Sequence, residues 1–236
     1  MNEIISQLIQ YGYIQEDTEI TQLVVSEALL AYQKYHIEIL DEISSSLYGK
    51  SAVVTGELDP ATIKLFSLPR CACPDFQTTG VGSWPKGCFD QEGHVFILKA
   101  NLRNKPAWVD FPKHFPRVTS SYQDVGLRIA FQQNQSSSRY HSVLSFERLS
   151  GGTIGLAIVP NRPTCSSRIW CKFSSSYRPS DIDNNWPRLL AHEIGHNMGL
   201  RHSRGGIMNP YIVSGAFTST AWRNDPSEKV LRSYFG

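Results

Sequence analysis

The chain has 236 residues, of which 41% are apolar and 19% charged, a composition typical of a folded globular protein of one large or two small domains. Its formal net charge is +2, and its Lys and Arg residues are scattered along the chain, so nucleic acid and anionic membranes are not expected as partners. No apolar run approaches about 20 residues, so no membrane span is predicted, and we expect a monomer.

The first seventy residues carry a helical pattern without strand signals. A helix is predicted over residues 2–11, and Asp59 followed by Pro60 is typical of a capped helix start, with that helix running through Phe66. Between them, apolar side chains recur at helical spacing at Ile20, Leu23, Val24, Ala31 and Tyr35. The sequence therefore predicts a small bundle of three short helices, followed by a flexible linker at residues 77–83.

Beyond this linker the pattern changes to strands with one long helix. Strands are predicted over 94–100, 142–147 and 153–159, with an edge strand over 168–173. A helix on the sheet is predicted from the apolar positions Val118, Tyr122, Val125 and Ile129. A second helix is expected to begin near Asn185 with Pro187 in its first turn, and a last one covers residues 226–234.

The long helix carries metal-ligand side chains at helical spacing. His192 and His196 are four residues apart and therefore lie on one face, where both can bind a single ion. Glu193 stands beside the first histidine, which is the general-base position of this pattern. Gly199 can adopt the left-handed conformation that ends a helix, and it allows His202 to return as a third ligand. Three protein ligands leave the fourth zinc position open, as in catalytic sites.

The chain contains five cysteines, an odd count: Cys71, Cys73, Cys88, Cys165 and Cys171. Short separations favour the pairs Cys165–Cys171 and Cys73–Cys88, although the sequence alone does not fix the connectivity. The alternative is that all five thiols are reduced in a cytosolic protein.

Two further motifs lie far apart in the chain. Residues 206–210 read Gly-Ile-Met-Asn-Pro, and residues 69–75, which we call the switch segment, read Pro-Arg-Cys-Ala-Cys-Pro-Asp. Together with the histidines of the long helix, they give the chain a resemblance to matrixins, the matrix-metalloproteinase-like zymogens of the metzincin group. Residues 206–210 are similar to the methionine turn that lies beneath the metal in metzincins, and the switch segment resembles the matrixin cysteine switch, PRCGxPD.

This resemblance implies an α+β protein, with a small helical-bundle inhibitory prodomain at 1–78 and a metzincin peptidase domain, a twisted mixed sheet packed with long helices, at 79–236. It implies one catalytic zinc held by His192, His196 and His202, with Met208 beneath it, and Glu193 as the catalytic base that loses at least about 10²–10⁴-fold in rate on truncation. In the latent form only, Cys71 occupies the open position as a thiolate while Arg70 pairs with Asp75. Substrates are proteins or peptides.

Departures from the family pattern leave several points open. Ala72 replaces the usual glycine, and Cys73 is a second thiol that competes with Cys71 for the role of zinc ligand. The region before the zinc helix is short and lacks the family's histidine- and glycine-rich loops, so one zinc is predicted, with calcium undecided. Tyr211 lies three residues after Met208 and is expected to pack rather than to bind metal. Packing roles are also expected for His36, His94, His114 and His141.

The resemblance also implies an extracellular protein, although residues 1–5 lack the layout of a signal peptide. An alternative function remains: the helical region resembles small peptidoglycan-binding modules, which would make the chain a cell-wall-associated hydrolase or binding protein.

Overall fold

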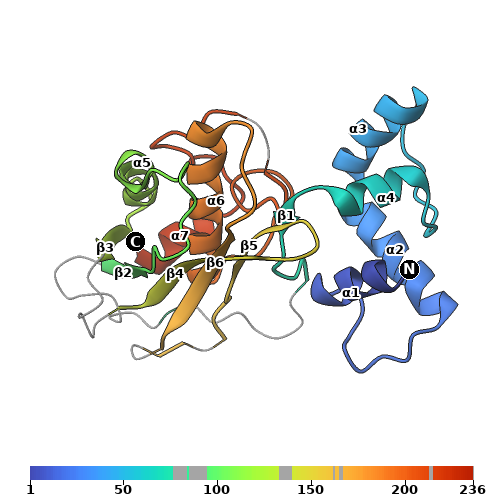
Figure 1. Ribbon diagram of the computed structural model, residues 1–236, viewed down its shortest axis with the longest axis horizontal. Helices are drawn as coiled ribbons and strands as arrows, with labels where there is room; N and C mark the ends of the chain where they lie inside the picture. Colours follow the sequence, from blue (N-terminus) through green and yellow to red (C-terminus); the bar gives the residue numbers. More distant parts are fainter. Residues whose placement is uncertain are drawn as a thin grey trace.

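The computed structural model describes residues 1–76, 84, 95–132, 140–161, 163–164, 167–212 and 215–235. A helical region formed by the first seventy residues lies beside a region in which helices pack on a β-sheet (Figure 1). The expected α+β architecture is confirmed. The predicted linker and His94 lie outside the described residues. No described helix is long and apolar enough to cross a membrane.

The helical region contains four helices rather than the predicted three. They are α1 (Asn2–Gln10), α2 (Gln22–Tyr35), α3 (Ile37–Tyr48) and α4 (Pro60–Ser67). The predicted cap is confirmed, since the Asp59 side chain accepts a hydrogen bond of 2.7 Å from the backbone N–H of Thr62. Of the apolar residues at helical spacing, Ile20 and Leu23 do not enter the core, because they are 43% and 67% exposed.

Tyr32 stands at the centre of the helical region's core. Its ring stacks on Phe66 with 4.2 Å between centroids, and Leu8, Leu29 and Leu65 are buried in the same cluster. Tyr211, which comes from the sheet region, belongs to this cluster as well. The helical region is therefore packed against the rest of the chain through a shared apolar core.

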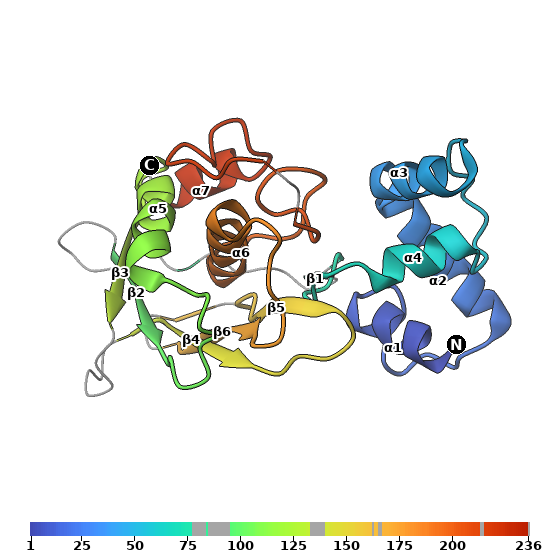
Figure 2. The ribbon, with the colours of Figure 1, turned by 45° about the horizontal axis from the view of Figure 1, so that its top comes forward.

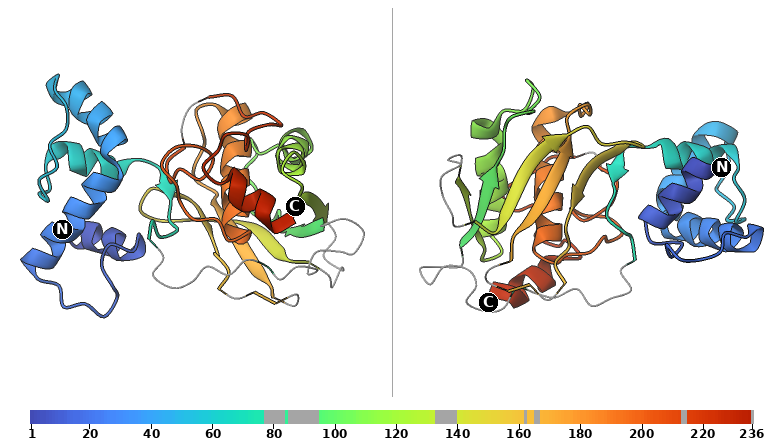
Figure 3. Two further views of the ribbon diagram at one scale, coloured as in Figure 1. Left: turned by 180° about the vertical axis from the view of Figure 1, so that it is seen from behind. Right: turned by 60° about the horizontal axis from the view of Figure 1, so that its bottom comes forward.

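The sheet has six strands in the order β1-β5-β6-β4-β2-β3. β5 pairs antiparallel with β6, and all other neighbouring pairs are parallel. Their bounds are β1 (Arg70–Cys71), β2 (Val95–Ala100), β3 (Arg128–Gln132), β4 (Ser142–Glu147), β5 (Thr153–Ala157) and β6 (Ile169–Ser174). The edge position next to β5 is thus taken by two residues of the switch segment (Figure 3).

Two long helices, α5 (Phe111–Gln123) and α6 (Ile182–Asn197), lie on the same face of the sheet (Figure 2). The short helix α7 (Glu228–Phe235) ends the described chain. Trp186 of α6 is 1% exposed and packs with Phe146 and Phe173, which project from neighbouring strands. This apolar layer fixes α6 against the sheet.

The predicted strand at 142–147 is confirmed, but two other assignments in the sheet region are wrong. Ile129 belongs to β3 and not to α5, because the helix ends at Gln123 and Gly126 adopts a left-handed φ of 95°. β6 was expected at an edge, but it pairs with both β4 and β5 and is interior. The alternation of buried and half-buried side chains in β6 is compatible with an edge strand and with an interior strand. The position of β6 in the sheet therefore depends on its pairing partners, which the alternation does not reveal.

α6 begins three residues earlier than expected. Asp181 caps it by accepting a 3.2 Å hydrogen bond from the backbone N–H of Asn184, so Pro187 lies inside the helix rather than in its first turn. A proline there leaves the carbonyl of Asp183 without its helical partner. Arg117 of α5 donates to this carbonyl, which compensates for the proline and joins the two helices.

Asn197, the last residue of α6, ties the helix to β4, to β6 and to the residue that follows β5. Its side-chain amide donates to the carbonyls of Ile158 (2.9 Å) and Trp170 (3.1 Å), and its Oδ1 accepts from the Ser142 hydroxyl (2.5 Å). The side chain is fully buried, so these bonds have no water to replace them.

We expect Asn197→Ala to lower the free energy of unfolding by roughly 2–4 kcal/mol, because it leaves the Ser142 hydroxyl and the carbonyls of Ile158 and Trp170 without their partner. Urea unfolding followed by circular dichroism measures this. The exposed Asn161 serves as the matched control, and Asn161→Ala should change stability by less than about 0.5 kcal/mol. Equal stability of the two variants would contradict the structural role of Asn197.

Candidate metal centre

Three imidazoles from α6 and the turn that follows it converge on one point. Nε2 of His196 lies 3.0 Å from Nε2 of His192 and 3.2 Å from Nε2 of His202. Cys71 Sγ lies 3.5 Å from the same His196 nitrogen. The sulfur and the three ring nitrogens all lie within 4.8 Å of one another, and all four residues are buried. The structure thus brings together the four side chains that the sequence singled out as metal ligands.

The outer nitrogen of each ring is held by a hydrogen-bond acceptor. His192 Nδ1 lies 2.7 Å from the Ile207 carbonyl, His196 Nδ1 lies 2.8 Å from the Leu200 carbonyl, and His202 Nδ1 lies 2.8 Å from Asp75 Oδ1. These acceptors require the proton to be on Nδ1, which leaves three Nε2 lone pairs facing one another. Such an arrangement is repulsive unless a cation lies between the nitrogens.

The spacing fits a tetrahedral metal site. Zinc bonds of about 2.0–2.1 Å to nitrogen and about 2.3 Å to sulfur place neighbouring nitrogens about 3.3 Å apart and a sulfur about 3.6 Å from each nitrogen. The distances between His196 and His192, His202 and Cys71 are close to these values. The donor set therefore fits a zinc-like ion.

Burial keeps the imidazoles neutral and therefore able to bind a metal. It lowers the pKa of His192 to about 3 and also lowers the pKa of His196 and His202, with Asp75 partly opposing the effect at His202. Burial likewise raises the pKa of the Cys71 thiol, so its thiolate form requires a nearby cation.

Two glycines shape the part of α6 that bears the metal ligands: one lets the chain turn after the helix, and the other leaves space for Met208. Gly199 has a φ of 94° and directly follows the C-cap of α6, as predicted, and the chain then returns to bring His202 beside the other two rings. Gly195 faces Met208, and a Cβ added there would lie 2.6 Å from the Met208 sulfur. Met208 is fully buried, so the methionine packs directly beneath the helical turn that bears the ligands.

Glu193 is fully buried beside the metal-ligand cluster, and neither of its carboxylate oxygens has a hydrogen-bond partner among the described residues. Burial raises its pKa well above the usual glutamate range, which makes the carboxylate a stronger proton acceptor. Gly155 of β5 makes room for this carboxylate, since a Cβ at that position would overlap it. Gly155 is a site residue that the sequence analysis missed, although a glycine inside an apolar strand is a signal of close approach.

The switch segment lies between β5 and the residues that follow Met208. Ala72 N–H donates to the Gly155 carbonyl at 3.0 Å, and Cys71 N–H donates to the Pro210 carbonyl at 2.8 Å. β1 is parallel to β5, whereas Arg70 forms an antiparallel bridge with Tyr211. The segment is therefore held as an extended strand with Cys71 beside the histidines.

Cys71 is the thiol that groups with all three histidines, whereas Cys73 groups only with Cys71, Glu193 and His196. The Cys73 sulfur instead lies 3.2 Å from the Ala157 carbonyl.

Cys73 and Cys171 are free thiols, so the predicted disulfides of Cys73 with Cys88 and of Cys165 with Cys171 are not formed. Cys88 and Cys165 lie outside the described residues. The physical reason is burial: the Cys73 sulfur faces β5, and Cys171 is fully buried on an interior strand. Short sequence separation does not bring together cysteines whose side chains point into the core.

Asp75 is the centre of a buried polar cluster that the sequence analysis only partly anticipated. It pairs with Arg70 at 2.6 Å, as expected, and both side chains are fully buried. It also accepts hydrogen bonds from the Tyr13 hydroxyl (2.8 Å) and from His36 (3.0 Å). His36 was expected only to pack, and no sequence signal could connect it with a carboxylate 39 residues away.

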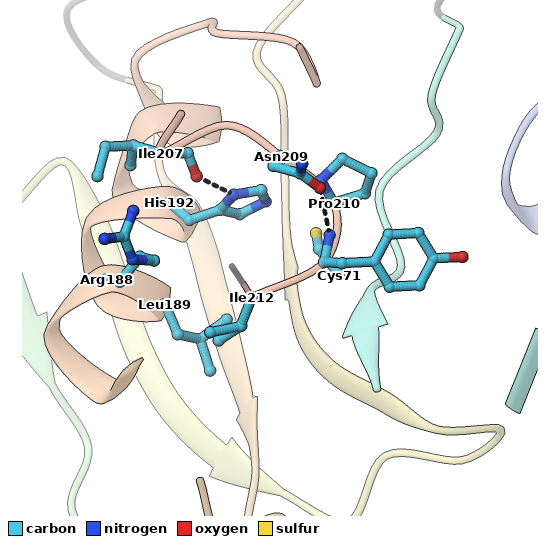
Figure 4. A pocket seen from close by; sticks show the side chains of 9 residues that line it. Cys71, Arg188, Leu189, His192, Ile207, Asn209, Pro210 and Ile212 are labelled. Carbon is cyan, nitrogen blue, oxygen red and sulfur yellow. Dashed lines mark hydrogen bonds between the residues drawn. The ribbon is translucent and has the colours of Figure 1, made fainter. Parts of the chain in front are cut away.

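A pocket opens beside Cys71 and His192 (Figure 4). Its lining includes the apolar side chains of Leu189, Ile207 and Ile212 together with Arg188. Tyr211 also borders it, but its hydroxyl lies 2.6 Å from that of Tyr32, so it packs against the helical region as expected.

Comparisons with known proteins agree with this chemistry. A family model described as Metallo-peptidase family M12B, Reprolysin-like, matches residues 104–203. Mouse (Mus musculus) matrix metalloproteinase-25 is 27% identical over 186 residues, which cover 66% of this chain and 29% of the relative. The hatching enzyme of Paracentrotus lividus is 28% identical over 174 residues, covering 66% of this chain and 28% of that protein. The chain thus matches less than a third of the length of these relatives.

Among solved structures, metalloproteinase-II from Bacteroides fragilis is similar, with 17% identity, a TM-score of 0.31 and coverage of 59% of this chain and 51% of that one.

The site predicts that the intact chain binds one zinc ion and that His196→Ala removes it, since His196 lies closest to all the other ligand atoms. Metal analysis after gel filtration measures the zinc content per chain. His114→Gln is the matched control, because His114 is a buried histidine that bonds to Asp183 outside the cluster. Full zinc content in His196→Ala, or two zinc ions per wild-type chain, would contradict the site as described.

Proposed function

Because the chain is a metzincin-like protein with relatives among the matrixins, we propose that it is a zinc-dependent metalloendopeptidase held latent by its own N-terminal region. The observation that supports this best is the convergence of Cys71, His192, His196 and His202 beside a buried, unpaired Glu193. His192, His196 and His202 would hold the zinc, and Met208 would support them from below. We further propose that residues 1–78 are an inhibitory prodomain and that residues 79–236 are the catalytic domain.

Zinc, when bound, is a Lewis acid that increases the acidity of water and polarises a peptide carbonyl. Glu193 is the proposed catalytic base: its carboxylate accepts a proton from the attacking water and later returns it to the nitrogen of the departing amine. Burial raises the pKa of Glu193, which strengthens its carboxylate as the proton acceptor in the first transfer. The products are a carboxylic acid and an amine, with no net proton change at Glu193.

In the latent form, the proposed role of Cys71 is to occupy the open metal position as a thiolate. Its sulfur lies beside the imidazoles, and the segment that carries it is bonded on both edges to the sheet region. Such tethering raises the effective concentration of the thiol to roughly the millimolar range or above. A cell-wall anchor is not favoured, because an anchor has no need for a thiol at a metal centre.

We propose that the active form binds extended protein or peptide substrates. Release of β1 would expose backbone groups of β5 on one side and of residues 209–212 on the other, which together suit an added strand. The pocket lined by Leu189, Ile207 and Ile212 would then receive a side chain next to the cut bond. An extracellular location follows from the resemblance and stays a prediction.

The decisive test is Glu193→Ala, made in a Cys71→Ala background so that the site is open. We expect casein hydrolysis to fall by about 10²–10⁴-fold while zinc content is unchanged, because the variant loses the proton acceptor but no ligand. The exposed Glu19 provides the control, and Glu19→Ala should keep full activity. A zinc-loaded Glu193→Ala variant that hydrolyses casein normally would refute the proposed role.

The activity of the intact chain can show whether Cys71 or Cys73 is the thiol that keeps it latent. We expect Cys71→Ala in the intact chain to raise casein hydrolysis on the order of 10²-fold, since the tethered zinc ligand is lost. Cys73→Ala should remain latent, because the sulfur of Cys73 faces Ala157. The reverse pattern would assign the ligand role to Cys73, and low activity in both variants would contradict a thiol-based latency.

A further inference from the structure

The three imidazoles of the metal centre are not anchored alike. His192 and His196 donate their Nδ1 protons to backbone carbonyls of Ile207 and Leu200, which belong to the same sheet region. His202 donates instead to Asp75, a residue of the switch segment. Within the part of the chain that the structure describes, this carboxylate is the acceptor that holds the His202 ring.

The position of Asp75 is itself set by the helical region. Its backbone N–H donates to the Tyr11 carbonyl at 2.9 Å, and its carboxylate is hydrogen-bonded to Arg70, Tyr13 and His36. Arg70 donates to both carboxylate oxygens, from Nη2 to Oδ1 and from Nη1 to Oδ2. Oδ1 also meets His202, whereas Oδ2 also meets Tyr13 and His36. Asp75 is 4% exposed, so water does not compete for these bonds.

We propose that Asp75 is a positioning residue for the metal centre, and that the switch segment therefore strengthens zinc binding at two points. Cys71 contributes a ligand, while Asp75 orients the His202 ring and increases the basicity of its inner nitrogen. This inference rests on the proposed function, because it concerns the same zinc. It goes beyond that function in stating that the latent chain retains its metal more firmly than thiol ligation alone explains.

Zinc binding and docking of the switch segment are thermodynamically linked. If docking of residues 69–75 strengthens zinc binding, zinc must strengthen docking of that segment by the same factor. The latent, metal-loaded form is thus stabilised as a unit, and release of the segment weakens the hold on His202 at the moment when the site opens.

Zinc release from the intact chain tests the proposal in a Cys71→Ala background, which removes the thiol contribution. The rate of zinc transfer to a colorimetric chelator is compared for this variant and for its combinations with Asp75→Asn and Asp183→Asn. We expect Asp75→Asn to accelerate release by about 10-fold or more. Asp183 is the matched control, because it bonds to a histidine, His114, outside the metal-ligand cluster, and its variant should release zinc at a rate within about twofold of the background.

The outcomes separate this inference from the proposed function. An unchanged release rate in Asp75→Asn, or equal acceleration by both substitutions, overturns the positioning role even if the chain hydrolyses casein. A wild-type chain that binds no zinc overturns both.

A measurement on the zinc-loaded wild-type chain avoids any folding defect of Asp75→Asn, which leaves buried Arg70 without its partner. Nitrogen-15 NMR of labelled histidines should show His202 carrying an exchange-protected proton on Nδ1. A His202 proton on Nε2, or one that exchanges as fast as that of an exposed histidine, overturns the proposal.

Discussion

The metal centre depends on hydrogen bonds that hold the outer nitrogens of three histidine rings. With the Nδ1 protons of His192, His196 and His202 engaged, each ring can present only its Nε2 lone pair to the centre. Burial prevents the rings from taking up protons to relieve the repulsion between these lone pairs. Folding therefore creates a cluster of buried lone pairs whose mutual repulsion a bound divalent cation would relieve.

The rest of the architecture supplies what this arrangement requires. The apolar layer around Trp186 fixes α6 on the sheet, and Asn197 anchors the end of the helix to the strands. Gly155 and Gly195 provide space where a side chain would collide with Glu193 or Met208. The switch segment then completes the sheet edge through backbone hydrogen bonds of the same kind that join the other strands. The inhibition that we propose would rest on these bonds.

The sequence carried strong information wherever a feature is local. Ligand spacing on α6, the turn at Gly199 and the cap at Asp59 each depend on residues a few positions apart, and all three are found as expected. Features that depend on contacts between residues far apart in the chain could not be predicted from the sequence. The sequence pattern places Ile129 of β3 on a helix and β6 at a sheet edge, and it does not reveal the contact between His36 and Asp75. Periodicity reports which face is buried, but not which element covers it.

The location of the Arg70–Asp75 ion pair affects how the helical region can separate from the sheet region. Both partners belong to the first 76 residues, as does Tyr11, whose ring lies 3.8 Å from the guanidinium carbon. Separation would carry the pair away whole, leaving neither an isolated cation nor an isolated anion on either piece. The electrostatic cost of parting these two buried charges is avoided. Separation instead breaks the pairing of β1 with β5, the hydrogen bond from His202 to the Asp75 carboxylate and the proposed bond between Cys71 and zinc.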